Sequence, residues 1–210
     1  MSKKPVKVLL VAEGEHERSG ALENLVRRLG GNDARFTARP ACDTSVHGRH
    51  GEGKGMGGSA KRALAWLREA WKDYDALIYL IDDDGGEDKR NEQIRKAQEF
   101  SDLNVPASCL PRAMGVAIKM FDAWILADEK ALTEVLGCTV ARQRDPETID
   151  EPKRVCERLL ANGANEKAQR KMYAEVALRL DIDVLTSRCP KGFKPFAERV
   201  RKMFGQETRA

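Results

Sequence analysis

The chain has 210 residues, enough for one hydrophobic core, and 41% of them are hydrophobic, a share typical of globular proteins. Its 37 basic residues against 33 acidic ones give a net charge of +4, a mild excess that does not by itself indicate nucleic-acid binding. No apolar run approaches the roughly 18 residues of a membrane span. The five cysteines are scattered and form no C-x-x-C pair, which argues against a disulfide framework or a zinc site and favours a cytoplasmic protein.

The first part of the chain alternates strand and helix patterns. An apolar, β-branched run at 6–12 follows the N-terminus directly, so we expect no signal peptide and a strand buried on both faces, as in a parallel sheet. Apolar residues then recur at helical spacing from Leu22 and predict a helix that ends at the glycine pair Gly30 and Gly31. Residues 35–39 predict a more polar strand nearer a sheet edge.

A glycine-rich stretch at 47–58 cannot build a core, and we expect a mobile loop there. Ser59 is the predicted N-cap of the helix that follows. The spacing of Leu64, Leu67 and Trp71 predicts that these side chains lie along its inner face.

The middle of the chain continues the alternation. Residues 76–81 predict a second buried strand, and a charged helix follows at about 91–100. A further strand is expected at 106–110 and a core helix at 116–127. These patterns favour an α/β fold with a central, mostly parallel sheet flanked by helices.

The last third is expected to be helical. Residues 142–152 are polar with two prolines and predict an exposed linker. Helices are expected at 155–160 and 171–180, a short connector at 181–185, and a final amphipathic helix at 196–204. We therefore expect additional C-terminal helices beside the α/β core.

Two of the predicted buried strands end in acids. Glu13 and Glu17 follow the first, and Asp82, Asp83 and Asp84 follow the second. In an open parallel sheet, ligands gather outside the carboxyl ends of the strands, so the two acidic groups converge if the strands are neighbours. Asp82 and Asp84 are two residues apart on an extended segment, so both can point to one side while Asp83 points to the other.

Several carboxylates brought together repel one another unless a cation lies among them. An oxygen-only ligand set suits a hard ion, Mg²⁺ or Mn²⁺. For the three aspartates alone, a helix cap or a solvated turn is an equal alternative. The second acidic group at the end of another buried strand favours the metal site.

Two motifs resemble the Toprim fold of topoisomerases, bacterial primases and overcoming-lysogenization-defect nucleases: V-L-L-V-A-E-G-E-H-E at 8–17 and L-I-Y-L-I-D-D-D at 77–84. That fold carries a Glu after its first strand, matched by Glu13, and an Asp-x-Asp after a later strand, matched by Asp82 and Asp84. Glu17 matches the second acid of the overcoming-lysogenization-defect branch. The resemblance implies Mg²⁺-dependent cleavage or strand transfer on DNA or RNA.

The chain is also similar over most of its length to a family of small Toprim-like proteins from bacterial defence islands, often encoded beside an ATPase. Residues 122–128 match its acid-Ala-Trp-Ile/Leu-Leu-Ala-Asp helix, with Asp122 in place of the common Glu, and 189–196 match its Cys-Pro-x-x-Phe-x-x-Phe pattern. The resemblance implies a Toprim-like catalytic core at 1–140 and a helical extension at 141–210 packed on the same domain, with an ATPase partner and a role in phage defence.

The resemblance also implies roles for individual residues. Glu13 is expected to act as the general base or as a bridging ligand. Asp82 and Asp84 are expected to hold the metal, with Glu17 supporting a second ion. Asp122 is either a further ligand or a structural acid paired with a nearby arginine or lysine.

Basic residues are expected to contact phosphate. Lys119, Lys191 and Lys194 are the candidates for stabilising the pentacovalent phosphate, and the sequence does not choose among them. Arg49 and Lys54 in the glycine-rich loop are expected to bind nucleic-acid phosphates. A solvated linker is the alternative for that loop.

The preferred hypothesis is a metal-dependent nuclease or strand-transfer enzyme with a DNA or RNA substrate, and a homodimer is one expected form. The alternative is a regulatory or effector subunit that binds nucleic acid or an ATPase without cutting, since a fold does not guarantee chemistry. A third hypothesis is a receiver-like phosphotransfer or nucleotide-binding protein, in which acids at strand ends also hold Mg²⁺. It is weaker because the sequence lacks a clear receiver lysine pattern.

Overall fold

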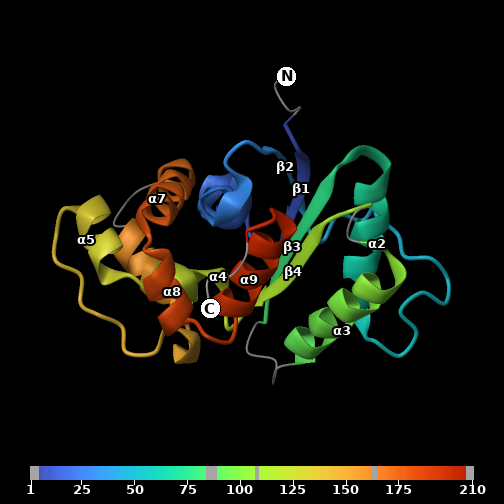
Figure 1. The fold of residues 1–210 in the computed structure, drawn as a ribbon. Coiled ribbons are helices and arrows are strands. Elements are labelled where there is room, and N and C mark those ends of the chain that lie inside the picture. Colours follow the sequence, from blue (N-terminus) through green and yellow to red (C-terminus); the bar gives the residue numbers. More distant parts are fainter. Residues whose placement is uncertain (1–4, 84–88, 107–108, 162–164, 207–210) are drawn as a thin grey trace.

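A computed structural model describes residues 5–83, 89–106, 109–161 and 165–206. Within that part of the chain, four strands form one sheet: β1 (Lys7–Ala12), β2 (Arg35–Pro40), β3 (Ala76–Asp82) and β4 (Arg112–Ala117). The strand order is β2-β1-β3-β4, and every neighbouring pair is parallel. The predicted α/β class with a parallel sheet flanked by helices is confirmed, and β2 lies at an edge as expected (Figure 1).

Two helices cover one face of the sheet, α2 (Gly58–Asp73) and α3 (Lys89–Asn104) (Figure 1). Alternate strand residues point toward them, among them Leu9, Val11 and Tyr79, and all three are buried in the core on this side. The strands are apolar on both faces because the other face is covered too.

The opposite face carries the helical segment that follows β1 and the helices near the C-terminus. The first consists of η1 (Glu17–Ala21), α1 (Leu22–Val26) and η2 (Arg27–Gly31), and so ends at the predicted glycine pair. Beside it lie α4 (Phe121–Ile125) and α9 (Phe193–Met203), and α9 packs on β4. Val8, Leu10 and Leu80 point from the strands into this second core.

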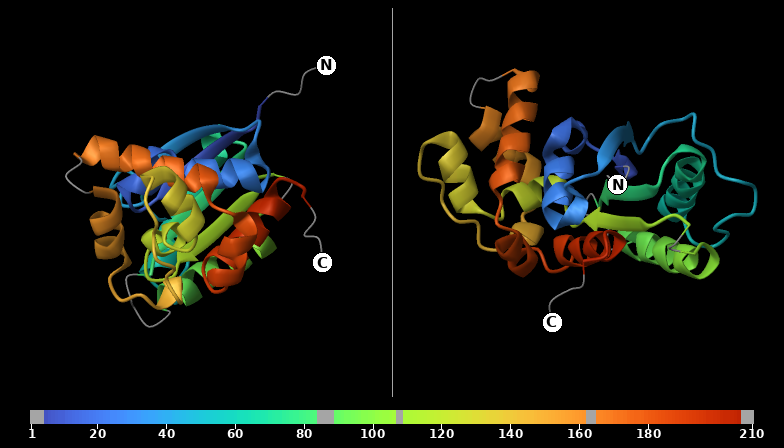
Figure 2. Two further views of the ribbon diagram at one scale, coloured as in Figure 1. Left: turned by 90° about the vertical axis from the view of Figure 1, so that its left-hand side faces the viewer. Right: turned by 45° about the horizontal axis from the view of Figure 1, so that its top comes forward.

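The remaining helices lie beyond α1 and α4, on the side away from α2 and α3 (Figure 2). They are α5 (Glu129–Leu136), η3 (Pro146–Thr148), α6 (Pro152–Cys156), η4 (Glu157–Ala161), α7 (Glu166–Arg179) and α8 (Ile182–Arg188). α7 packs along η1 and α1. One hydrophobic cluster runs from β1 to α9, so the helices after residue 140 share a core with the sheet.

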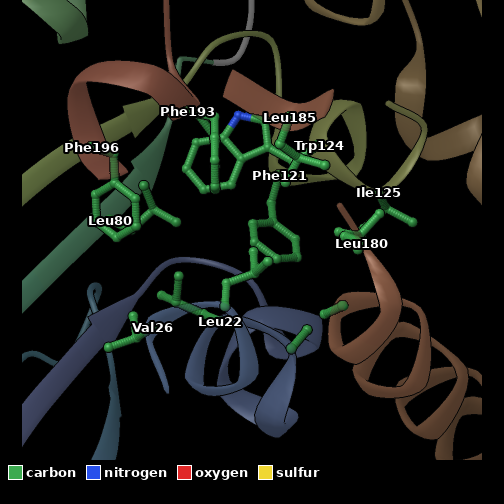
Figure 3. Close-up of a cluster of buried hydrophobic side chains, with 14 of the residues drawn as sticks. Leu22, Val26, Leu80, Phe121, Trp124, Ile125, Leu180, Leu185, Phe193 and Phe196 are labelled. Atoms are coloured by element: carbon green, nitrogen blue, oxygen red, sulfur yellow. The ribbon is translucent and has the colours of Figure 1, made fainter. Parts of the chain in front are cut away.

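Within this core, an aromatic cluster joins α4 to α9 (Figure 3). The ring of Trp124 on α4 lies 5.1 Å from that of Phe193 and 5.6 Å from that of Phe196, centroid to centroid. Phe196 also rests on β4 at Gly115, where a Cβ would lie 2.6 Å from the Phe196 ring. The sequence pattern around Cys189 therefore serves to dock α9 on the sheet.

The predicted positions of the fourth strand and the following helix were wrong. The strand is β4 at Arg112–Ala117, and the core helix begins only at Phe121. Of the predicted strand at 106–110, residues 107–108 lie outside the described residues and 109–110 are not in a strand. The strand begins with a buried arginine, which sequence patterns disfavour. Arg112 is accommodated because Ser101 Oγ, at 2.7 Å, and backbone oxygens of the loop after α3 accept its hydrogen bonds.

Three smaller expectations also failed. The N-cap of α2 is Gly57, and the N–H of Ser59 instead donates to Gln93 Oε1 at 2.9 Å. Trp71 does not face the core, since it is 51% exposed. The segment predicted as a connector at 181–185 forms the start of α8, because the Asp181 side chain caps that helix. In the described part of the chain, no helix is long and apolar enough to cross a membrane.

Candidate functional site

The acids that follow β1 and β3 meet at the carboxyl edge of the sheet. β1 and β3 are hydrogen-bonded neighbours, with Ala12 opposite Leu80. Glu13 therefore lies beside the last residue of β3, and its Oε2 accepts a hydrogen bond from the Asp82 N–H at 3.2 Å. The expected convergence of the two acidic groups is thus present for Glu13 and Asp82. Asp84 lies outside the described residues.

Arg90, at the start of α3, binds both strand ends. Its Nη1 lies 3.0 Å from Glu13 Oε2 and 2.6 Å from the backbone oxygen of Asp82. The Arg90 and Glu13 side chains are 33% and 37% exposed, so the pair is at the surface of the site. A guanidinium therefore neutralises Glu13 at its contact with β3.

Glu17 is folded back into the protein beneath the turn after β1. It is buried, and its Oε1 accepts a hydrogen bond from the Gly14 N–H at 3.3 Å. A Cβ on Gly14 would lie 2.2 Å from Glu17 Oε2. Only glycine at this position leaves room for the carboxylate.

Asp82 fixes the start of α4. Its Oδ1 accepts a hydrogen bond from the backbone N–H of Phe121 at 2.9 Å, at the first residue of that helix. This contact ties the end of β3 to the element that carries Asp122. The four acids Glu13, Glu17, Asp82 and Asp122 consequently come from three segments far apart in the sequence.

Asp122 is buried and held by α7 and α6. The hydroxyl of Tyr173 donates a hydrogen bond to Asp122 Oδ1, and the thiol of Cys156 donates to the Asp122 backbone oxygen at 3.5 Å. The ring of His16 stacks flat on Tyr173, with centroids 4.0 Å apart. If Asp122 were only a structural acid, an arginine or lysine was the partner expected from the sequence. The side chain that binds its carboxylate is instead a tyrosine.

Burial and mutual repulsion shift the ionisation of this acidic cluster. Burial raises the pKa of Glu17 to about 7, and the nearby Asp122 charge acts in the same direction. Burial also raises the pKa of Asp82 well above its usual range, with further upward contributions from Glu17, Asp122 and Glu13. Glu17 and Asp82 therefore hold their protons more tightly than exposed acids do, and a cation would relieve the same repulsion.

The chemistry of the donors fits a hard cation, but the described side chains are bound to protein donors. Among the residues that the structure describes, no group of three or more His, Cys, Asp or Glu side chains is arranged to hold a metal ion. Asp82, Glu17 and Asp122 supply carboxylate oxygens only, as Mg²⁺ and Mn²⁺ prefer.

A protein-family model described as a domain of unknown function, DUF4276, matches residues 12–201. The chain belongs to this family. The DUF4276 match runs from the last residue of β1 into α9 and so contains the whole acidic cluster and Arg90. Nothing matched in the comparisons with curated proteins and with solved structures.

The lysines predicted to contact phosphate are not bound to the acidic cluster in this DUF4276 protein. Lys119 follows β4 with a left-handed backbone, φ 64°, and its amine lies 3.5 Å from Asp150 Oδ1. Lys191 and Lys194 have exposed side chains in and after the turn before α9. The N–H of Lys191 donates to Glu147 at 3.0 Å, so this turn has a structural role as well.

Arg49 and Lys54 lie in the loop between β2 and α2, as the sequence suggested, and their side chains are exposed. They are not part of the acidic cluster. The residues that sequence reasoning missed are Arg90 and Tyr173. Arg90 had one signal, since it is a basic residue shortly after the aspartates of β3. Tyr173 had none, because its approach to Asp122 depends on how α7 packs.

Proposed function

We propose that this chain is a metal-dependent nuclease of Toprim type that hydrolyses nucleic-acid phosphodiesters. The observation that carries the proposal is the convergence of Glu13, Glu17, Asp82 and Asp122 at the carboxyl edge of a parallel sheet. Bringing several carboxylates together in a partly buried place is costly, and clusters of this kind are a feature of functional sites. The Toprim resemblance of the two strand-end motifs supports the same reaction class.

The proposed metal ligands are Asp82, Glu17 and Asp122, with Glu13 at the rim. A bound Mg²⁺ or Mn²⁺ would polarise the phosphodiester and stabilise the charge that develops on it. Glu17 and Asp82 would release their protons when a cation binds, since the raised pKa of each reflects burial and like-charge neighbours.

Glu13 and Arg90 have proposed roles of their own. Glu13 would accept the proton of the attacking water as its oxygen bonds to phosphorus, and the bond between phosphorus and the leaving oxygen would break, with the leaving oxygen taking a proton from solvent. Arg90 already lies 3.0 Å from Glu13, and its planar guanidinium suits a phosphate oxygen. We assign Arg90, in place of the three lysines, as the cation that contacts the reacting phosphate.

A cleavage assay tests this proposal. Plasmid, linear DNA and structured RNA are incubated with the purified protein and Mg²⁺ or Mn²⁺. We expect cleavage that Glu13→Gln abolishes and that Glu15→Gln retains, since Glu15 lies in the same turn but is exposed and pairs with Arg170. Cleavage that survives Glu13→Gln would show that the assignment of the site is wrong.

A second candidate is a protein that binds nucleic acid without cutting it. The observation that favours it is that Glu13, Asp82 and Asp122 each accept a hydrogen bond from the protein itself. Binding without cleavage under any divalent metal would support this candidate. A cytoplasmic location, an ATPase partner, a homodimer and a role in phage defence remain predictions.

A further inference from the structure

The outer surface of α2 carries an exposed aromatic side chain. Trp71 is 51% exposed, whereas the other two tryptophans of the chain, Trp66 and Trp124, are fully buried. Leaving half an indole in water forgoes the large gain of burying it. The exposed part of the Trp71 indole is therefore available to pack against a bound molecule.

Trp71 borders a hollow of about 620 Å³ between the loop after β2, α2 and the end of α3. The apolar part of its lining includes Leu64 and Leu67 from α2 and Phe100 and Val105 from α3 and the loop after it. A hollow of this size is typical of sites for small molecules or single units of a polymer.

A second hollow, of about 560 Å³, is lined by residues of the same loop and by the start of α2. Val46, His47 and Arg49 line both hollows, so the two are adjacent. Together they follow α2, whose 16 residues span about 24 Å.

Basic side chains dominate the charged lining of the two hollows. The basic residues are Arg49, Lys61, Arg62, Arg68 and Lys72, and the acidic residues are Glu52 and Glu69. Both acids are already paired, Glu52 with Arg68 and Glu69 with Lys72, each at 2.7 Å. The balance that remains is positive and suits an anionic polymer.

The loop that lines both hollows is held in place by arginines. Arg62 Nη1 donates to the backbone oxygens of Asp43 and Val46, at 3.2 and 3.1 Å. Arg68 Nη2 donates to the His47 oxygen at 3.2 Å. These bonds fix the walls of both hollows and leave the exposed side chains of Arg49 and Lys61 facing solvent.

The second hollow lies near the acidic cluster. It includes Gly58 at the start of α2, and the next residue, Ser59, is hydrogen-bonded to Gln93 on α3. Gln93 is one turn from Arg90, which binds Glu13. The path along α2 therefore begins near the proposed catalytic edge and ends at Trp71.

We propose that this surface is the binding track for a single-stranded segment of the nucleic-acid substrate. A base stacks on the open face of Trp71, and Arg49 and Lys61 contact the phosphates. Stacking on an exposed aromatic needs an unpaired base, which a duplex does not offer. This inference rests on the proposed function and names its substrate class, unpaired DNA or RNA.

Tryptophan fluorescence tests the track without any cleavage. An unstructured oligonucleotide of about 12 residues is added to the full chain without divalent metal, in the wild type and in Glu13→Gln. We expect quenching of the exposed emission in both, weakened by salt. Trp71→Phe should remove the quenchable emission, and Trp71→Ala should raise Kd, measured by anisotropy, at least about fivefold.

Matched variants separate the track from general charge effects. Arg49→Glu should weaken binding more than Lys171→Glu, which reverses one exposed charge on α7. Leu103→Ala, at a side chain that is 87% exposed and lines neither hollow, should leave Kd unchanged.

Three outcomes would overturn the proposal. The first is unchanged tryptophan fluorescence under conditions in which anisotropy shows that the oligonucleotide is bound. The second is an affinity for a blunt duplex equal to that for the single strand. The third is a fluorescence change that a mononucleotide saturates at the same concentration of nucleotides. Binding at Trp71 without cleavage would support the track while contradicting the nuclease. Cleavage that does not involve Trp71 would support the nuclease and contradict the track.

Discussion

The Nη1 atom of Arg90 lies 3.0 Å from Glu13 Oε2 and joins the end of β1 to the start of α3. The same atom binds the backbone oxygen of Asp82 at 2.6 Å. A cation that binds Glu13 would have to compete with this guanidinium or displace it. Arg90 is therefore placed both to occupy the site without metal and to contact a phosphate once released.

Arg90→Ala should strengthen the binding of Mn²⁺ by several-fold, because a positive charge that competes for Glu13 is removed. The metal-free protein should lose only about 0–1 kcal/mol of stability, since the ion pair is partly exposed. Titration calorimetry with Mn²⁺ gives the affinity. An affinity that is unchanged or weaker in the variant would contradict the competition.

The raised pKa of Glu17 predicts how stability depends on pH. Burial raises this pKa to about 7 from an ordinary 4.5. Between these values the folded chain binds more protons than the unfolded chain, so the free energy of unfolding falls as the pH rises through this window. Without divalent metal, the melting temperature at about pH 5.5 should therefore exceed that at about pH 8.

Glu17→Gln is the control for that pH dependence. The amide keeps an oxygen for the Gly14 N–H but does not titrate, so the slope should flatten. Mn²⁺ should raise the melting temperature of the wild type more at high pH than at low pH, because the cation binds ionised carboxylates. Equal stabilisation at both pH values would argue against a cation among these acids.

The features predictable from the sequence were those with local signals. Glu13 and Glu17 follow the apolar run that forms β1, and Asp82 ends the apolar run that forms β3. The two groups meet because β1 and β3 are neighbours in the sheet. Trp71 was misplaced because helical spacing cannot tell a core face from the wall of an open hollow. The contacts of Arg90 and Tyr173 depend on how α3 and α7 pack, which no local pattern encodes.

Tyr173→Phe should destabilise the protein by about 1–3 kcal/mol, because the buried Asp122 carboxylate loses the hydrogen bond from the tyrosine hydroxyl. Urea unfolding measures the change. Tyr74→Phe removes a hydroxyl from a half-buried tyrosine at the end of α2 and should cost less. Equal effects of the two substitutions would mean that the bond to Asp122 contributes nothing specific.

Glycine at position 14 is required by the Glu17 carboxylate, not by its own backbone conformation. A Cβ there would lie 2.2 Å from Glu17 Oε2 and 2.8 Å from its Cδ, so Gly14→Ala must push the carboxylate out of its buried position. The main elements need not move, because the clash involves one side chain. We expect loss of cleavage and of the pH-dependent stability assigned to Glu17, with a fold that far-UV circular dichroism finds unchanged.

Gly48→Ala is the matched control, since a Cβ at Gly48 meets nothing within 4 Å. It should leave metal binding and melting temperature as in the wild type. Gly115→Ala shows the effect of a clash inside the hydrophobic core, because its Cβ would lie 2.6 Å from the Phe196 ring. That substitution should lower stability by about 1–3 kcal/mol through overpacking. If Gly14→Ala retained full cleavage, the buried position of Glu17 would not be needed for activity, and its place among the proposed metal ligands would have to be given up.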